Sequence, residues 1–222
     1  MIVPEEQVCP LCCYGDAIAY HQDKTRLYLN CRVCDLVFVP PAQHLSAVDE
    51  KACYDLHNNQ ADDPGYRRFL DRLFSPMCER LTPGASGLDI GCGPGPTLSG
   101  MFEDMGHAVA LYDPFYAPDT SVLSARYDFI TLSEVIEHMA TPGSDMDNLW
   151  SCLKPGGWLG IMTKRVHDLE AFRGWHYITD PTHISYFSEE TFRWMTARWT
   201  AMGHAANLTV VGSDVVLIEK GH

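Results

Sequence analysis

The chain has 222 residues, of which 46% are hydrophobic and 20% charged, enough to fill the core of one α/β domain with a small appendage and to exclude general disorder. Its formal net charge of −13 argues against binding to nucleic acid or to an anionic membrane surface, because so acidic a surface repels phosphate. No apolar stretch approaches the roughly 18 residues of a bilayer-spanning helix, and residues 1–6 lack signal-peptide features, so we expect a cytoplasmic protein with no membrane contact.

Four of the nine cysteines form two close pairs near the N-terminus. Two residues separate Cys9 from Cys12, and two separate Cys31 from Cys34. This spacing lets both sulfurs of one turn bind a single tetrahedral ion, and a short hairpin can bring the second turn opposite the first. The pattern predicts a zinc ribbon whose Zn2+ is structural, since four thiolates leave no open coordination position. Cys13 could compete as a ligand, although a free neighbouring thiol is the favoured interpretation.

The remaining chain divides into a connector and one large domain. The ribbon should occupy residues 1–41, and the polar residues 42–63 separate it from the first apolar helical pattern. That pattern predicts a helix over residues 64–75, which Pro76 kinks or ends because proline lacks an N–H and clashes with the preceding turn. Over residues 64–222, short apolar runs alternate with amphipathic stretches, which is typical of βαβ units and a parallel sheet.

A glycine-rich turn follows the first apolar strand of the large domain. In residues 87–96, Gly91, Gly93 and Gly95 alternate, with Cys92 after the first of them, and an amphipathic helix comes next. Such glycines allow positive φ and close approach of a ligand, while the helix N-terminus offers N–H groups to a carboxylate or phosphate. The spacing differs from the dinucleotide-binding motif and lacks the Lys-Ser/Thr ending of a phosphate loop, so nicotinamide and ATP are not favoured.

An acidic residue ends the second predicted strand, residues 108–112. In an α/β nucleotide-binding fold, a carboxylate at this position accepts hydrogen bonds from ribose hydroxyls. By itself Asp113 could be an ordinary turn residue, which Pro114 after it would support. The glycine turn and the carboxylate together favour a nucleoside site.

Four sequence motifs follow one another along the chain. They are the glycine turn at residues 88–95, the acidic strand end at Asp113, a buried strand with its polar continuation at residues 127–138, and the turn at residues 153–157. In this order they resemble the class I S-adenosylmethionine-dependent methyltransferases over residues 85–165. The resemblance implies a Rossmann-like, doubly wound α/β fold whose seven-stranded sheet ends in a reversed hairpin.

The resemblance also implies a cofactor site. S-adenosylmethionine would lie along the glycine turn with its ribose hydroxyls on Asp113, and the residues assigned to it are Asp89, Gly91, Cys92, Gly93, Gly95, Asp113, Pro114, Ser133 and Glu134. Only residues 114–126 precede the next strand, too few for the usual helix and third strand, so we expect this region to be shortened. Phe115 and Tyr116 could stack on the adenine or cover the sheet edge, and the sequence leaves both open.

Methyl transfer to a hydroxyl or a carbon acid requires that a proton leave. His138 beside Glu137, and His183 near Asp180, are the candidate general bases, because the pKa of histidine lies near neutrality. A structural role stays open for both, with His138 as a cap and His183 in packing. Metal binding by His176, Asp180 and His183 is not favoured, because their spacing on a loop fixes no common face.

Aromatic side chains are dense in residues 172–187. We expect them, together with the connector 42–63, to cover a small ring-like or apolar acceptor. The competing interpretation is a hydrophobic seam beneath the helix that carries Phe192, Met195 and Trp199.

The sequence thus predicts a methyltransferase that uses S-adenosylmethionine and Zn2+ and acts on oxygen, carbon or nitrogen of a small-molecule acceptor. One alternative is an RNA base methyltransferase whose ribbon grips RNA, which the acidic charge disfavours. Another is a cofactor-binding protein without turnover whose ribbon docks a partner. The sequence does not indicate an oligomeric state.

Overall fold

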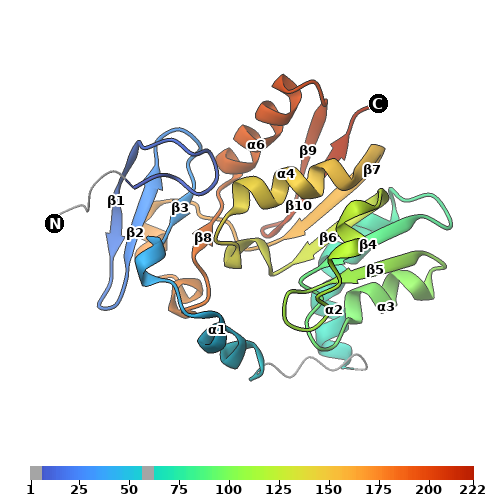
Figure 1. Ribbon diagram of the computed structural model, residues 1–222, viewed down its shortest axis with the longest axis horizontal. Helices are drawn as coiled ribbons and strands as arrows, with labels where there is room; N and C mark the ends of the chain where they lie inside the picture. Colours follow the sequence, from blue (N-terminus) through green and yellow to red (C-terminus); the bar gives the residue numbers. More distant parts are fainter. Residues whose placement is uncertain (1–6, 57–62) are drawn as a thin grey trace.

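The computed structural model of the protein describes residues 7–56 and 63–222 (Figure 1). The expectation about the start of the chain, and the connector at residues 57–62, lie outside the described residues. The N-terminal elements are β1 Ala17–Gln22, β2 Leu27–Cys31, β3 Val37–Phe38, η1 Pro41–Gln43 and α1 Ala47–Tyr54. The later elements are α2 Pro64–Cys78, β4 Ser86–Ile90, α3 Thr97–Asp104, β5 Ala108–Tyr112, η2 Thr120–Ser124, β6 Tyr127–Ser133, η3 Ile136–His138, α4 Pro142–Cys152, β7 Leu153–Met162, α5 Leu169–Arg173, η4 His176–Thr179, β8 Ser185–Tyr186, α6 Glu189–Ala201, β9 Ala206–Val211 and β10 Val215–Lys220.

The central sheet has 6 strands in the order β5-β4-β6-β7-β10-β9. Strands β5, β4, β6 and β7 are parallel, and β10 is antiparallel to both of its neighbours. This order confirms the predicted Rossmann-like fold and the reversed hairpin at its end. The sheet lacks the third strand of the seven-stranded type: in the fully described stretch between Asp113 and β6, η2 takes its place, as the short segment predicts.

Helices cover both faces of this sheet (Figure 1). Alternate residues of β10 face opposite ways, so Val215 and Leu217 pack with α2 and α3, while Val216 and Ile218 join the core beneath α4 and α6. Both faces are therefore buried, as expected for a doubly wound sheet. Among the helices of the described ranges, none combines the length and the apolar composition needed to cross a bilayer.

The first helix of the large domain is longer than the sequence predicts. Asp63 caps α2 with Pro64 in its first turn, and the helix continues past Pro76 to Cys78. Of the two expectations for Pro76, a kink or an end, the end is therefore wrong. The last turn is held by packing, because Leu73 and Met77 lie so close to Gly160 of β7 that a Cβ there would meet both.

The ribbon shares a sheet with the large domain. Its three strands extend to β8 in the order β1-β2-β3-β8, with Val37 opposite Tyr186 and Phe38 opposite Ser185. The ribbon side chains also pack into the core beneath α4 and α6. Residues 7–41, the described part of the ribbon, therefore have no separate core, although they form a recognisable unit in Figure 1.

Both cysteine turns contact the large domain directly. The carbonyl oxygen of Leu11 approaches Gly143 at the start of α4 so closely that a Cβ on Gly143 would lie 2.3 Å from it. On the second turn, Asp35 accepts a 2.6 Å hydrogen bond from the hydroxyl of Ser188, the N-cap of α6. Folding of the ribbon is thus coupled to the first turns of two helices that cover the sheet.

Candidate active site

A cavity of about 670 Å³ opens at the carboxyl ends of β4, β5 and β6. The strand order reverses between β5-β4 and β4-β6, and ligands of open α/β sheets bind at such a switch point. The strand-end residues in its wall are Gly91, Cys92, Gly93 and Pro94 after β4, Asp113, Pro114, Phe115 and Tyr116 after β5, and Ser133, Glu134 and Val135 at the end of β6.

The turn after β4 depends on two glycines with left-handed backbone. Gly91 has φ 66° and Gly93 has φ 62°, values that favour glycine. A Cβ on Gly91 would lie 2.4 Å from Cγ2 of Val135, whereas one on Gly93 would meet nothing within 4 Å. Gly91 therefore lets the turns after β4 and β6 pack together, and Gly93 leaves its backbone open to a ligand.

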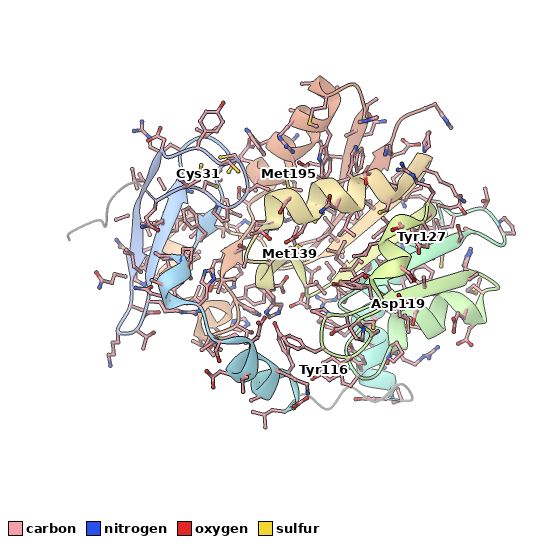
Figure 2. All side chains as sticks on the ribbon, in the orientation of Figure 1. Cys31, Tyr116, Asp119, Tyr127, Met139 and Met195 are labelled. Carbon is pink, nitrogen blue, oxygen red and sulfur yellow. The ribbon has the colours of Figure 1, made fainter. Side chains whose placement is uncertain are left out.

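Asp113 ties together the turns on either side of the switch point. Its Oδ2 accepts a 3.0 Å hydrogen bond from the N–H of Gly93, and its Oδ1 accepts from the N–H groups of Phe115 at 2.8 Å and Tyr116 at 3.0 Å. A carboxylate has about four lone-pair sites, so it can still accept from a ligand in the cavity. Tyr116 in turn donates a 2.6 Å hydrogen bond to Asp55 next to α1, and Figure 2 shows it beside this helix.

Two histidines line another part of the cavity wall. His138 ends η3 and His183 precedes β8, and their ring centroids are 4.7 Å apart. Nδ1 of His138 lies 3.1 Å from the carbonyl oxygen of Thr182, and Nδ1 of His183 lies 2.8 Å from that of Tyr177. Burial lowers the pKa of His183 to about 4, so this ring is neutral at pH 7.

Two glutamates, one of them half-buried, accompany the histidines. Glu137 is fully buried and accepts a hydrogen bond from the hydroxyl of Tyr177, which also lies 3.2 Å from Oε2 of Glu134. Burial raises the pKa of Glu137, and burial together with the neighbouring Glu137 raises the pKa of Glu134. Glu134 also has φ 53°, a strained backbone for a residue other than glycine.

The family of the chain follows from comparison with known proteins. A family described as "Methyltransferase domain" matches residues 59–199, well over half of the sequence. The chain belongs to this methyltransferase family. It is an S-adenosylmethionine-dependent methyltransferase, and the switch-point cavity lies where its fold places the ligand. Comparison with curated protein sequences gives no match.

Solved structures share the fold of this methyltransferase. A chain of the complex between the Haloferax volcanii Trm112 methyltransferase activator and the putative methyltransferase has a TM-score of 0.51 at 10% identity, covering 78% of this chain and 98% of its own. The Burkholderia thailandensis 1,6-didemethyltoxoflavin-N1-methyltransferase, solved with 1,6-didemethyltoxoflavin and S-adenosylhomocysteine, has a TM-score of 0.48 at 17% identity, covering 92% and 99%. At such identities the likeness concerns the fold alone.

Three of the predicted site residues do not line the cavity of the methyltransferase. Asp89, on the strand, is 3% exposed and accepts a 2.7 Å hydrogen bond from Thr131 on the neighbouring strand β6, and burial raises its pKa to about 7. Gly95 and Glu137 are also absent from the cavity wall. The other predicted cofactor residues and both histidines do line it. Neither Glu137 nor Asp180 orients a histidine through Nδ1, because backbone carbonyls occupy both positions.

The aromatic cover predicted for residues 172–187 is wrong. Phe172, Tyr177 and Tyr186 are at most 5% exposed and pack with Tyr28 and neighbouring residues of the ribbon. None of the aromatic side chains of this segment lines the cavity, which it reaches only through Asp180 and His183. The segment thus forms a hydrophobic seam, whose partner is the ribbon.

Several residues that sequence reasoning missed do line the cavity. Glu50 and Tyr54 reach it from α1, and Tyr66 and Phe69 from α2. Tyr66 and Phe69 were missed because aromatic residues at helical spacing usually indicate a core position. Tyr54 could have been found, because it lies in the connector that the sequence predicts to cover the site. The described part of the connector does form part of the cavity wall.

Gly91 offers a direct test of the turn geometry. Gly91→Ala should lower the free energy of unfolding by roughly 2–4 kcal/mol, because it combines a clash with Val135 and a left-handed φ, and it should also weaken cofactor binding. Urea unfolding followed by circular dichroism measures the loss. The matched control is Gly100→Ala in α3, where a Cβ has open space and should stabilise the helix by about 0.5–1 kcal/mol. Equal effects at both positions would contradict the assignment.

The four paired cysteines come together in the ribbon. The Sγ atoms of Cys9 and Cys34 are 3.5 Å apart, those of Cys12 and Cys31 are 3.4 Å apart, and all four lie within 4.8 Å of one another. Zinc–sulfur bonds of about 2.3 Å in a tetrahedron place sulfurs about 3.8 Å apart, so this donor set fits a zinc ion. Figure 2 shows Cys31 on the side of the ribbon that faces Met195 of α6, and both residues belong to one hydrophobic cluster. Cys13 is exposed and lies outside the sulfur cluster.

Proposed function

We propose that this enzyme transfers the methyl group of S-adenosylmethionine to a small-molecule acceptor within the switch-point cavity. The observation that carries the proposal is that one cavity joins the glycine turn and Asp113 to His138 and His183. Its volume of about 670 Å³ lies in the range of small-molecule and cofactor sites. The nucleoside would lie against Gly93 and Asp113, and the acceptor against Tyr54 and the two histidines.

The charge of the cavity wall supports this cofactor. Five acidic residues line the cavity, and no lysine or arginine of the described residues does; they are Glu50, Asp113, Asp145 and Asp180, together with Glu134, whose raised pKa reduces its negative charge at neutral pH. A sulfonium and an ammonium group are both cations, so a negative wall favours S-adenosylmethionine. The same wall disfavours an RNA acceptor, whose backbone phosphates are usually bound by basic side chains.

Catalysis in this site would depend mainly on alignment. The sulfonium is already an activated methyl donor, so holding the acceptor atom in line at about 3–3.5 Å contributes most of the rate. Tyr54 and His138 contact each other with ring centroids 5.3 Å apart and would form the wall that orients the acceptor.

We also propose that Cys9, Cys12, Cys31 and Cys34 bind one structural Zn2+. Four thiolates complete a tetrahedral site and leave no position for a substrate. The ion would hold together the two turns that contact α4 and α6.

Calorimetry with purified, zinc-containing protein tests the cofactor assignment. We expect binding of S-adenosylmethionine and of S-adenosylhomocysteine, and mass spectrometry of reactions with a panel of small hydroxyl, amine and carbon-acid acceptors should show addition of one methyl group. Absence of binding would refute the assignment. Binding without methylation of any acceptor would support a non-catalytic cofactor protein, and methylation of RNA would overturn the small-molecule assignment.

A further inference from the structure

Three potential metal ligands lie close together where His138 and His183 line the cavity. Glu137 and His138 come from η3, and His183 comes from the loop before β8. One potential ligand atom from each lies within 4.8 Å of the other two. Ligand atoms around a single metal ion with bonds of about 2.1 Å lie about 3–4 Å apart, so the cluster has the dimensions of a metal site.

The carboxylates of Glu134 and Glu137 each have one oxygen without a hydrogen-bond donor among the described residues. Among the described residues, neither Oε2 of Glu137 nor Oε1 of Glu134 has a hydrogen-bond partner, although both atoms are buried. The hydroxyl of Tyr177 contacts both side chains but has one proton to donate, and the hydroxyl of Thr163 is another donor near Glu137. A buried carboxylate oxygen without a partner is costly, so this pair requires either an added proton or a bound cation.

The basic side chains near the carboxylates have hydrogen bonds elsewhere. Lys164 donates a 2.7 Å hydrogen bond to Nε2 of His176, and Arg72 donates to Asp214. Neither of them lines the cavity at this point. They do not take the place of a cation between Glu137 and the histidines.

The backbone sets the tautomer of both imidazoles. A carbonyl oxygen only accepts, so Nδ1 of His138 and of His183 must carry the hydrogen, and Nε2 is the nitrogen of each ring that can bind an ion. Metal-binding histidines typically show this arrangement, in which one nitrogen donates to a carbonyl and the other binds the ion.

From these observations we infer that Glu137, His138 and His183 bind a divalent transition-metal ion such as Mn2+, Fe2+ or Zn2+. Two imidazoles and one carboxylate suit these ions better than Mg2+ or Ca2+, which prefer oxygen ligands. Three protein ligands leave coordination positions open, and both histidines line the cavity, so these positions face the acceptor.

The inferred site narrows the acceptor class, and this step rests on the proposed function. A cation here would bind a hydroxyl oxygen of the acceptor and lower its pKa, so that the proton leaves to water. The oxygen lone pair would then form the new C–O bond as the C–S bond breaks, with its electron pair passing to sulfur to give S-adenosylhomocysteine. No group is oxidised or reduced. The acceptor would be an alcohol, enol or phenol.

Titration with Mn2+, followed by electron paramagnetic resonance, tests the site directly. Intact protein that contains one Zn2+ per chain, the number that the four thiolates bind, should take up one further Mn2+ per chain, because Mn2+ competes poorly for thiolates. Glu137→Gln, which keeps the shape of the side chain, and His138→Ala should each weaken Mn2+ binding by more than about 10-fold. His167→Ala, an exposed histidine outside the cluster, is the matched control and should bind Mn2+ like the wild type.

The outcomes separate this inference from the proposed function. Absence of Mn2+ binding in the wild type, or equal binding in all variants, would overturn the metal site. Calorimetry with S-adenosylhomocysteine is run on the same samples and should give unchanged affinity in His138→Ala if the fold is intact. If the wild type does not bind S-adenosylhomocysteine, that result would instead refute the proposed function.

Discussion

Replacing Asp113 with alanine should weaken binding of S-adenosylmethionine and S-adenosylhomocysteine by about 100-fold, measured by calorimetry. A ribose hydroxyl that donates to the lone-pair site left on the carboxylate contributes about 1.5–3 kcal/mol, and the upper end of this range corresponds to a loss of this size. The carboxylate also holds the N–H groups of Gly93, Phe115 and Tyr116, so its removal loosens both turns of the cofactor site. Loss of the ribose contact and loosening of the two turns both lower the affinity for the cofactor.

Two further variants distinguish these contributions. Asp113→Asn keeps one oxygen to accept from the turns but removes the charge, so its affinity should fall between those of the wild type and Asp113→Ala. Asp119→Ala removes an exposed carboxylate that caps η2 in the same segment and should leave affinity unchanged. Wild-type affinity in Asp113→Ala would show that the nucleoside does not bind at this strand end.

Local patterns were enough to bring most of the predicted cofactor residues to the wall of one cavity. The glycine turn and Asp113 lie at strand ends, and parallel strands bring their carboxyl ends to one edge of the sheet, so sequence order is enough to place them together. Asp89 is the exception, since it belongs to the strand itself. Its side chain hydrogen-bonds Thr131 on the neighbouring strand and does not line the cavity.

Two features could not be predicted from the sequence because they depend on packing between residues far apart in it. The aromatic residues of 172–187 are hydrophobic and precede a helix, which fits either a cover or a seam, and only the position of the ribbon decides between them. Similarly, Pro76 predicts either a kink or an end of the helix, and packing of Met77 against Gly160 lets α2 continue past it. Propensity is a weak guide where tertiary contacts are strong.

The meeting of His138 and His183 also depends on the ribbon. Arg26 is 8% exposed, and its guanidinium donates to four backbone carbonyls of the segment that precedes β8, those of Ile178, Asp180, Pro181 and His183. Pairing of β3 with β8 holds the end of this segment. The ribbon therefore positions the segment that carries His183 at one side of the cavity, which no local pattern indicates.

Loss of the ribbon metal should consequently impair methyl transfer more than cofactor binding. Cys34→Ser removes a buried thiolate from the four-sulfur cluster, and we expect the variant to lose its zinc and its melting temperature to fall by on the order of 10 °C, because structural zinc sites supply much of the folding free energy of their modules. Metal analysis and thermal unfolding measure both effects. Affinity for S-adenosylhomocysteine should change little, since Gly91, Gly93 and Asp113 belong to β4 and β5 turns outside the ribbon.

Cys13→Ser is the matched control for this prediction. Cys13 adjoins the first cysteine turn but is exposed and lies outside the sulfur cluster, so the variant should keep its zinc, its melting temperature and its activity. Equal loss of zinc in both variants would show that Cys13 belongs to the site. Loss of zinc in Cys34→Ser without a change in turnover would contradict the positioning of His183 through Arg26, because the acceptor pocket would then be complete without a folded ribbon.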